Sequence, residues 1–535
     1  MIRTADRMAA TLYQAGVRHA FGMPGGEVTV LVDALAKAKI DFVLARNETA
    51  AAMMAAGACV EAQRPGLLVT TIGPGLANAV NGIADAMQER IPLIVLSGTI
   101  EEHLRGRYTH QVIDHRQLLA PIVKASFEIA PETASAVVAR AIRLAMTHPC
   151  GPVHIDLSPS MADAPSCEKT AASFVRLQAP TPDPQSALVS DIRDRLASAQ
   201  RPIILAGLSA ARAAGAAEFT SLVERIGAPV LTTYKAKGLI DENHPLCISA
   251  AGLSPRADAL ILPLLRQADL ILLLGYDPIE MRASWLDPVD DPSRIIDIGP
   301  PHDHAMHLAG RRIDAAPMDF LSAMLVDFPQ RSLWPNGEPQ NVRKALRLSV
   351  ADAPEWGPSA IFETLQQALP TEAVVSVDSG AHRILLSQVW RCSKPFGLVQ
   401  SAGWCTMGSA LPLAIGCKLS DPNKRVVAVL GDGGLEMTLG ELGTIRDRNL
   451  AITIVVLQDQ SLELIGMKQD QAELKRRATG LGATDYALIA RAFSGKGVSV
   501  QTKDELRSAL AEAEGQSAFT LISCAIPGDS YAGLL

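Results

Sequence analysis

The stretch of residues 426–459 constrains the fold of this chain most. Five apolar residues at 426–430 run directly into Gly431-Asp432-Gly433-Gly434. Residues 435–448 then have helical periodicity, and a second, largely apolar run ends at Asp459. An apolar run bounded by glycines is typical of a buried parallel strand. The order therefore predicts strand, glycine turn, helix and strand.

The two strand ends place acidic residues where a ligand can bind. Adjacent parallel strands finish at the same edge of a sheet, so Asp432 and Asp459 are expected to meet there. Carboxylates, backbone carbonyls and diphosphate oxygens form a shell that suits magnesium, and glycine N–H groups before a helix favour phosphate. An ordinary βαβ unit with a glycine turn is the alternative. A Rossmann dinucleotide motif fits less well, because Glu436 stands at its third glycine position.

Composition sets the class of protein. A chain of 535 residues is too long for one core, which predicts about three domains. The net charge is −7 without a basic run, which disfavours nucleic-acid binding. Eight cysteines without CxxC or zinc-like spacing predict free thiols in a reducing cytoplasm. No signal-peptide segment and no apolar run of membrane-spanning length is found, so a cytoplasmic protein is expected.

The pattern of buried strands and helices predicts an α/β chain with three doubly wound parallel-sheet domains. They are assigned to residues 1–164, 185–330 and 355–535. Linkers rich in proline and small or polar residues are expected near 165–184 and 329–354. The first and third domains share a strand, glycine turn and helix order, although this is not a sequence repeat.

Glu48 is the main candidate in the first domain. It follows a strand predicted at 40–45 and opens an alanine-rich helix over 49–63. A carboxylate at a helix N-terminus is stabilised by the helix dipole, so Glu48 by itself reads as a first-turn charge.

Six motifs in order give the sequence a family resemblance. The chain resembles acetolactate-synthase-like thiamine-diphosphate (ThDP) enzymes over essentially its whole length. The resemblance implies pyrimidine-binding, central and diphosphate-binding domains in that order. It rests on Phe21-Gly22-Met23-Pro24-Gly25-Gly26, Arg46-Asn47-Glu48, Gly73-Pro74-Gly75-Leu76-Ala77-Asn78, Ile91-Pro92-Leu93-Ile94-Val95-Leu96-Ser97-Gly98, Val377-Asp378-Ser379-Gly380-Ala381-His382 and Gly403-Trp404-Cys405-Thr406-Met407-Gly408, beside the Gly-Asp-Gly motif.

The resemblance assigns roles to residues. Glu48 would hydrogen-bond the pyrimidine ring and promote removal of the thiazolium proton, and Met407 would hold the cofactor bent. Asp432, Asp459 and the Ser461 carbonyl would bind Mg²⁺, with Asp459 adding a charge where the family has Asn. The further cofactor residues would be Pro24, Thr71, Asn78, Gly380, Ala381, His382, Thr406, Gly431, Gly433, Gly434, Leu462, Glu463 and Leu464.

The resemblance also implies a homodimer or homotetramer with active sites between subunits. Glu48 of one subunit would serve the cofactor held by the third domain of another. Small 2-oxo acids, aldehydes or ketones are the expected partners. FAD in the central domain is considered but not favoured, because only Ala251-Gly252-Leu253-Ser254-Pro255 represents the family's glycine-rich FAD stretch.

The substrate side departs from true acetolactate synthases. Gln111 and Lys124 match family residues near the substrate, and Lys124 is expected to pair with a carboxylate, a solvated surface lysine being the alternative. Gly25, His110 and Lys468 complete this set. The departures are Asn47 for His, His110 for Phe, Lys468 for Trp and Gly434-Leu435 for Ser-Phe. Together they predict a more polar pocket.

The leading hypothesis is a ThDP- and Mg-dependent 2-oxo acid decarboxylase or carboligase with a substrate more polar than pyruvate alone. One alternative is a ThDP-dependent carbon–carbon lyase acting on a 2-hydroxyacyl, oxalyl-CoA-like or diketone substrate. The alternative from another class is a non-catalytic relative that binds the cofactor. The donor, the acceptor, the stereochemistry and the need for a regulatory subunit are not given by the sequence.

Overall fold

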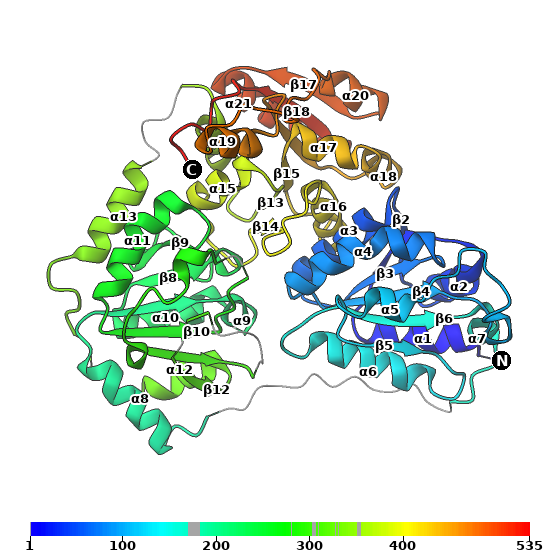
Figure 1. Ribbon diagram of the computed structural model, residues 1–535, viewed down its shortest axis with the longest axis horizontal. Coiled ribbons are helices and arrows are strands. Elements are labelled where there is room, and N and C mark those ends of the chain that lie inside the picture. The colour runs from blue at the N-terminus through cyan, green and yellow to red at the C-terminus, as the bar shows by residue number, and fades with distance from the viewer. Residues whose placement is uncertain are drawn as a thin grey trace.

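In a computed structural model the chain forms three α/β domains, each built on a six-stranded parallel sheet (Figure 1). The structure describes residues 2–168, 182–213, 215–279, 281–301, 307–308, 310–326, 328–329, 331–349 and 355–535. This confirms the predicted fold class. The two predicted linkers lie partly outside the described residues. None of the described helices combines the length and the apolar character needed to cross a membrane.

The N-terminal domain, blue to cyan in Figure 1, has strand order β2-β1-β3-β4-β6-β5. Its strands are β1 (His19–Met23), β2 (Asp41–Leu44), β3 (Gly66–Thr70), β4 (Leu93–Gly98), β5 (Ser126–Glu128) and β6 (Val153–Leu157). Its helices are α1 (Thr4–Gln14), η1 (Gly26–Val28), α2 (Thr29–Lys37), α3 (Glu48–Ala62), α4 (Pro74–Gln88), η2 (Glu102–Leu104), α5 (His115–Leu119), α6 (Ala134–Met146) and α7 (Pro159–Asp163).

The central domain, green in Figure 1, has strand order β12-β11-β10-β7-β8-β9. Its strands are β7 (Pro202–Ala206), β8 (Val230–Thr233), β9 (Cys247–Ala251), β10 (Leu270–Leu274), β11 (Ile295–Gly299) and β12 (Arg311–Asp314). Its helices are α8 (Ala187–Ser198), α9 (Leu208–Ala213), α10 (Ala216–Ile226), η3 (Tyr234–Ala236), α11 (Pro255–Gln267), η4 (Ala283–Trp285), η5 (Pro292–Arg294) and α12 (Pro317–Met324), with α13 (Glu338–Leu348) packed on α11.

The C-terminal domain, yellow to red in Figure 1, has strand order β14-β13-β15-β16-β18-β17. Its strands are β13 (Val374–Val377), β14 (Leu398–Gln400), β15 (Val426–Gly431), β16 (Thr453–Gln458), β17 (Lys496–Val500) and β18 (Thr520–Ala525). Its helices are α14 (Pro358–Ala368), α15 (Ala381–Val389), α16 (Ala410–Ser420), α17 (Asp432–Thr438), α18 (Glu441–Asp447), α19 (Glu463–Gln471), α20 (Tyr486–Ala492) and α21 (Lys503–Ala513).

The outer two domains share one topology, and the central domain has another. When the strands are counted from the start of each domain, the N-terminal and C-terminal sheets both run 2-1-3-4-6-5. The central sheet runs 3-2-1-4-5-6, the order of dinucleotide-binding folds. The shared strand and glycine order of the first and third domains therefore reflects a shared topology.

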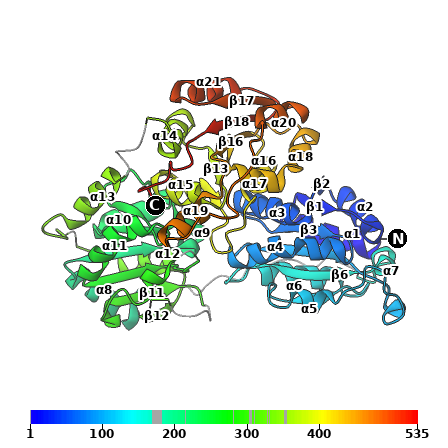
Figure 2. The ribbon, with the colours of Figure 1, turned by 45° about the horizontal axis from the view of Figure 1, so that its top comes forward.

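The N-terminal and C-terminal domains meet along α3 and α16, which lie side by side in Figures 1 and 2. A Cβ on Gly57 would stand 2.2 Å from the Leu413 carbonyl oxygen, and one on Gly416 would stand 2.0 Å from that of Met54. The helix backbones are therefore in direct contact, which only glycine allows at these two positions. Apolar residues of both domains join here in one continuous core.

The helix expected over 435–448 is two helices, which corrects the prediction. α17 starts earlier, at Asp432, and the chain breaks at Leu439-Gly440 before α18. Carbon atoms of Arg46, which follows β2 of the N-terminal domain, come within 4 Å of the position that a Cβ on Gly440 would take. Arg46 also forms an ion pair with Asp447 at the end of α18. The segment at the break is therefore in contact with another domain.

Candidate active site

Asp432 and Asp459 lie at adjacent strand ends of the C-terminal sheet. Asp432 begins α17 directly after β15, and Asp459 follows the neighbouring parallel strand β16. Asp432 Oδ1 accepts the Gly433 N–H at 2.8 Å, and Oδ2 accepts the Gln460 N–H at 2.7 Å. The fold therefore brings both carboxylates to one edge and orients Asp432 through the backbone.

Burial makes ionisation of this pair costly. Burial and the negative charge of Asp432 together raise the pKa of Asp459 to about 7. The pKa of Asp432 is raised too, mainly by burial. The nearby buried carboxylate of Glu463 is neutralised by Arg476 at 2.8 Å. Since a divalent cation would remove the repulsion, this oxygen donor set, with the Ser461 carbonyl, fits Mg²⁺.

His382 lies beside the glycine turns expected to hold a diphosphate. It belongs to the first turn of α15, and its ring comes within 4 Å of the Cβ positions of Gly380 and Gly431. Its Nε2 is buried without a hydrogen-bond partner in the part of the chain that the structure describes. Burial lowers the pKa of His382 to about 4, so the ring is neutral at pH 7. A buried polar atom without a partner suits a phosphate oxygen at this helix start.

Asp378 connects this edge to the turn that carries Met407. The buried carboxylate accepts the Gly408 N–H at 2.9 Å and the Ser409 N–H at 2.8 Å, and burial raises its pKa to about 6. A Cβ on Gly434 would stand 1.9 Å from Asp378 Oδ2, so a glycine is required there. Asp378 was not among the predicted site residues, although it follows a strand end as Asp432 does. The strand-end rule could have found it.

Met407 lies next to the Gly-Asp-Gly turn. Its methyl carbon is 3.6 Å from the Cβ position of Gly433, which also touches Leu462 and Leu481. The preceding Thr406 N–H donates to Ser401 Oγ at 3.0 Å. An apolar side chain thus stands beside the predicted metal and diphosphate residues, as a wedge under the cofactor would.

Glu48 is buried at the first position of α3. Its Oε2 accepts a hydrogen bond from Asn78 Nδ2 at 2.5 Å, and the Asn47 side chain caps the helix. Asn78 comes from α4, so two helix starts meet at the carboxyl edge of the N-terminal sheet. The structure therefore brings together Glu48 and Asn78, two of the predicted cofactor residues.

Thr71, Gly25 and a residue that the sequence reasoning missed lie at the same edge. Thr71 follows β3 and donates its hydroxyl to Glu27 Oε2 at 2.7 Å. A Cβ on Gly25 would stand 2.1 Å from Thr71 Oγ1. Pro24 beside it is exposed. Glu27 belongs to none of the sequence motifs, and only the folded turn after β1 brings its side chain to Thr71.

The exposed Gln111 lies over the glycine turn that starts α4. Its carbonyl oxygen is 2.0 Å from the Cβ position of Gly73, whose φ of +53° also favours glycine. His115 holds the same turn, since its Nε2 accepts the Gly73 N–H at 3.3 Å while its Nδ1 lies 2.7 Å from Asp156 Oδ1. The loop with Gln111 is thus fixed to the segment that carries Asn78.

His115, Asp156 and His154 are buried, and their nitrogen and oxygen atoms lie within 4.8 Å of one another, a spacing that a metal could use. Because His115 Nε2 accepts the Gly73 N–H, the proton is on Nδ1 and donates to Asp156. Burial alone would raise the pKa of Asp156, but the hydrogen bond from His115 and the nearby His154 ring lower it to about 2. The cluster is therefore best described as a hydrogen-bond network that supports the glycine turn.

The structure argues against Lys124 as a substrate ligand. Its ammonium donates to the Leu144 and Thr147 carbonyls at 2.6 and 2.7 Å, at the C-terminal end of α6. Lys124 also precedes β5, which places it at the amino edge of the sheet, whereas Glu48 follows β2 at the carboxyl edge. Both predictions for Lys124, a partner of the substrate carboxylate and a solvated surface lysine, are therefore wrong, because its ammonium caps the end of α6.

Of the other predicted residues, Ser461, Leu464 and Lys468 follow Asp459, whereas His110 belongs to the N-terminal domain. Ser461 donates its N–H to Asp459 Oδ1 at 3.1 Å, and Leu464 packs against the core of the domain. Lys468 lies on the exposed face of α19. His110 is exposed on the loop beside Gln111.

The two groups of predicted cofactor residues belong to different domains. Glu48 bonds to Asn78 within the N-terminal domain, while Asp432 bonds within the C-terminal domain. Between the domains, Glu89 at the end of α4 accepts the Ala402 and Gly403 N–H groups and pairs with Lys235 of the central domain. All three domains therefore meet just before the turn that carries Met407.

The strand-order reversal of the central sheet, where FAD was considered, lies between β7 and β10. There the Cβ position of Gly207 is 2.5 Å from the Gly275 carbonyl oxygen, so the two backbones are in contact. Asp277 pairs with Arg90 of the N-terminal domain at 2.8 Å. Whether this domain binds FAD stays a prediction.

Comparisons with known proteins agree with this geometry. Residues 2–118 match the thiamine pyrophosphate enzyme N-terminal TPP binding domain, 189–314 the central domain and 378–524 the C-terminal TPP binding domain. The chain is 28% identical to the acetolactate synthase of Bacillus subtilis (strain 168), over 95% of this chain and 90% of that one. It is 28% identical to the Escherichia coli (strain K12) acetolactate synthase isozyme 3 large subunit, over 96% and 92%. The chain belongs to the thiamine pyrophosphate enzyme family and is related to acetolactate synthases.

Proposed function

We propose that this protein is a ThDP- and Mg-dependent 2-oxo acid decarboxylase or carboligase whose substrate is more polar than pyruvate alone. The observation that carries the proposal is the carboxylate pair of the buried Asp432 and the half-buried Asp459, which repel each other near Met407 and near His382, whose Nε2 has no partner among the described residues. Such a site gains most from a bound cation and a diphosphate. When bound, ThDP supplies the electron sink for cleavage next to a carbonyl.

The proposed roles fall to residues at two sheet edges, one in the C-terminal domain and one in the N-terminal domain. Asp432, Asp459 and the Ser461 carbonyl would hold Mg²⁺, and His382 with the Gly433 and Gly434 backbone would bind the diphosphate. Glu48, oriented by Asn78 at 2.5 Å, would hydrogen-bond the pyrimidine ring. Glu48 and Asp432 would come from different subunits of a homodimer or homotetramer. Each active site would then lie at a subunit interface.

The substrate side would be more polar than that of an acetolactate synthase. The loop with His110 and Gln111 lies over the turn that leads to Asn78, and its side chains are exposed. Lys468 is exposed on α19, which follows the predicted metal residues. We expect His110 and Lys468 to select a 2-oxo acid with an extra polar or acidic group.

The first experiment measures carbon dioxide release from a panel of 2-oxo acids. Protein stripped of cofactor is assayed with and without ThDP and Mg²⁺. Release that requires both additions supports the proposal, and the best acid identifies the donor. No release from any acid, despite tight ThDP binding, would contradict it and favour a carbon–carbon lyase or a non-catalytic relative.

A second experiment tests the polar pocket. The double variant His110→Phe, Lys468→Trp should shift the ratio of kcat/KM values toward pyruvate by about tenfold or more, since a pocket that loses polar groups loses their binding energy. An unchanged substrate profile would refute the assignment of these two residues. A visible absorbance spectrum of the purified protein tests FAD independently.

A further inference from the structure

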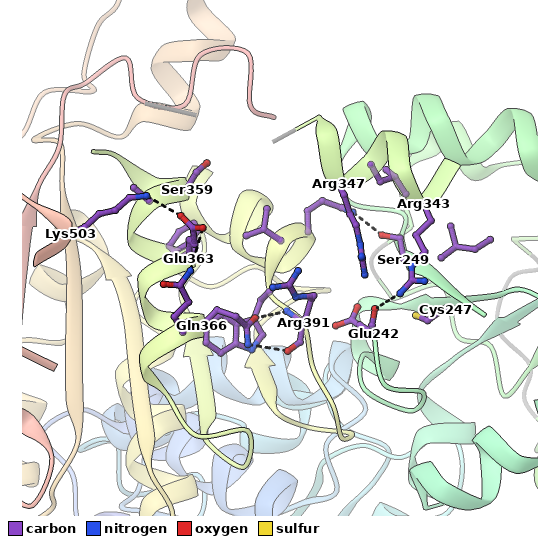
Figure 3. Close-up of a pocket in the computed structure, with 18 residues that line it drawn as sticks. Glu242, Cys247, Ser249, Arg343, Arg347, Ser359, Glu363, Gln366, Arg391 and Lys503 are labelled. Atoms are coloured by element: carbon purple, nitrogen blue, oxygen red, sulfur yellow. Dashed lines mark hydrogen bonds and ion pairs between the residues drawn. The ribbon is translucent and has the colours of Figure 1, made fainter. Parts of the chain in front are cut away.

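A cavity of about 400 Å³ lies between the central and C-terminal domains (Figure 3). Its walls come from β9 and α13 on one side and from α14, the end of α15 and the start of α21 on the other. None of the predicted cofactor or substrate residues lines it. The size is that of a small-metabolite site.

Positive charge gathers in this cavity, although the whole chain carries a net charge of −7. Arg343 and Arg347 stand one turn apart on α13, and Arg391 follows α15. Figure 3 shows Arg347 and Arg391 entering the cavity from opposite domains. Arg343 donates to the Asn243 carbonyl at 2.7 Å, which satisfies N–H groups without neutralising the charge.

Among the residues that the structure describes, two carboxylates line the cavity, and each is paired with a lysine. Glu363 pairs with Lys503 at 3.0 Å. Glu242 pairs with the buried Lys237 at 2.6 Å and accepts the Cys392 N–H at 2.7 Å. Among the described residues, the three guanidinium groups are therefore left without a carboxylate partner.

Burial and the positive charge of Arg347 both lower the pKa of Arg343, which agrees with their closeness. Two like charges held together in a cavity are stabilised by an anion that lies between them.

The first turn of α14 offers donors on the opposite wall. Ser359 lines the cavity, and its hydroxyl is buried without a hydrogen-bond partner among the described residues. The Ncap of α14, Gly357, gives the helix start no side-chain cap. An uncapped helix N-terminus and an unpartnered hydroxyl both favour a phosphate group.

We propose that this cavity binds a phosphate-bearing metabolite. The metabolite is held between Arg343 and Arg347 of α13, on the side of the central domain, and Arg391 of the C-terminal domain. Guanidinium groups bind phosphate in bidentate fashion, and the volume leaves room for more than the phosphate itself. The ligand would contact both domains and so couple their positions. This site is separate from the proposed catalytic one, and its test does not depend on turnover.

Isothermal titration calorimetry on the holoenzyme, saturated with ThDP and Mg²⁺, tests the site with two probes, ADP and inorganic phosphate. We expect saturable binding that weakens about tenfold or more in Arg347→Gln and in Arg391→Gln. The matched control is Lys344→Gln, an exposed cation on α13 that does not line the cavity. It should bind as the unmodified protein does. Melting temperatures check that each variant folds.

The relative affinity of the probes identifies the ligand source. Tighter binding of ADP indicates a nucleotide, whereas equal binding of both probes indicates that the phosphate group alone is recognised. Binding that persists unchanged in Arg347→Gln and Arg391→Gln would place the ligand elsewhere and overturn the proposal. No heat with either probe at millimolar concentration would overturn it as well.

Discussion

Two pairs of acids in this molecule each include one carboxyl with a pKa of about 7, but the surroundings of the two pairs differ. Burial and Asp432 raise the pKa of Asp459 to about 7. Burial and Glu89 raise the pKa of Asp85, on α4, to about 7 as well. The pKa value alone therefore does not distinguish Asp459 from Asp85.

The partners of the two pairs differ. Glu89 is paired with Lys235 and accepts two backbone N–H groups, and Asp85 accepts the Ser401 hydroxyl. In the part of the chain that the structure describes, Asp432 and Asp459 accept backbone N–H groups and have no cationic side chain in an ion pair. The protein itself neutralises the pair Asp85 and Glu89, whereas the pair Asp432 and Asp459 requires a positive charge from a bound ligand. A raised pKa thus indicates a ligand site only where the protein supplies no counter-charge.

The largest expected effect on cofactor binding follows from removing a carboxylate of the pair Asp432 and Asp459. Asp432→Asn should weaken Mg-dependent ThDP binding by more than about 100-fold, because a neutral amide oxygen replaces the charged carboxylate that attracts the cation. Fluorescence titration with ThDP at fixed Mg²⁺ measures this. The protein without cofactor should remain folded, since the substitution relieves repulsion. Unchanged ThDP affinity would remove Asp432 from the metal site.

Glu48→Gln should reduce turnover by about 100- to 10,000-fold, because the amide cannot take the carboxylate's place in proton transfer. ThDP binding should change little, as the contacts to the diphosphate and metal are intact. Steady-state kinetics at saturating ThDP measure the loss. Retention of most of the activity would refute the role of Glu48.

Co-expression of Glu48→Gln with Asp432→Asn extends this test to the subunit arrangement. If each site uses Glu48 of one subunit and Asp432 of its partner, a mixed dimer has one intact site, and random assembly restores about a quarter of the activity. No recovery in verified mixed dimers would mean that both residues serve a site within one chain.

Glu89→Gln tests the neutralised pair. It leaves the Lys235 ammonium without its carboxylate at the junction of the three domains, which should cost about 3–5 kcal/mol of stability. Thermal unfolding of the cofactor-free protein measures this. Part of the loss should return in the double variant Glu89→Gln, Lys235→Met. A larger effect on ThDP affinity than on unfolding would instead place Glu89 in the cofactor site.

Local sequence patterns predicted much of the C-terminal edge. Apolar runs that end in glycine and aspartate identified β15 and β16, and parallel pairing alone required Asp432 and Asp459 to meet. The same rule applied to the strand before Asp378 would have identified that carboxylate as well. Hydrophobic periodicity and the residues at the end of a strand are local features of the sequence, so they can be recognised before the fold is known.

Contacts between distant segments could not be predicted in this way. Lys124 matched a family position, yet its ammonium caps α6, because only the folded chain brings that helix end within reach. Glu89 reaches Lys235 and Gly403, which lie in two other domains. The break between α17 and α18 likewise lies against Arg46 of the N-terminal domain. Such pairings are set by packing across domains.

The smallest expected effect is a pH dependence that distinguishes the two acid pairs. Because the pKa of Asp459 lies above that of a carboxyl in the unfolded chain, the stability that this group contributes is fully present below about pH 4 and is lost as the pH rises toward 7. Cofactor-free Asp459→Asn should therefore lose less stability between pH 5 and pH 8 than the unmodified protein does. Mg²⁺ with ThDP should flatten the unmodified profile, because the cation stabilises the ionised pair. Equal slopes with and without Asp459 in chemical unfolding would show that the carboxylate is already neutralised within the chain, and the contrast with Glu89 would no longer hold.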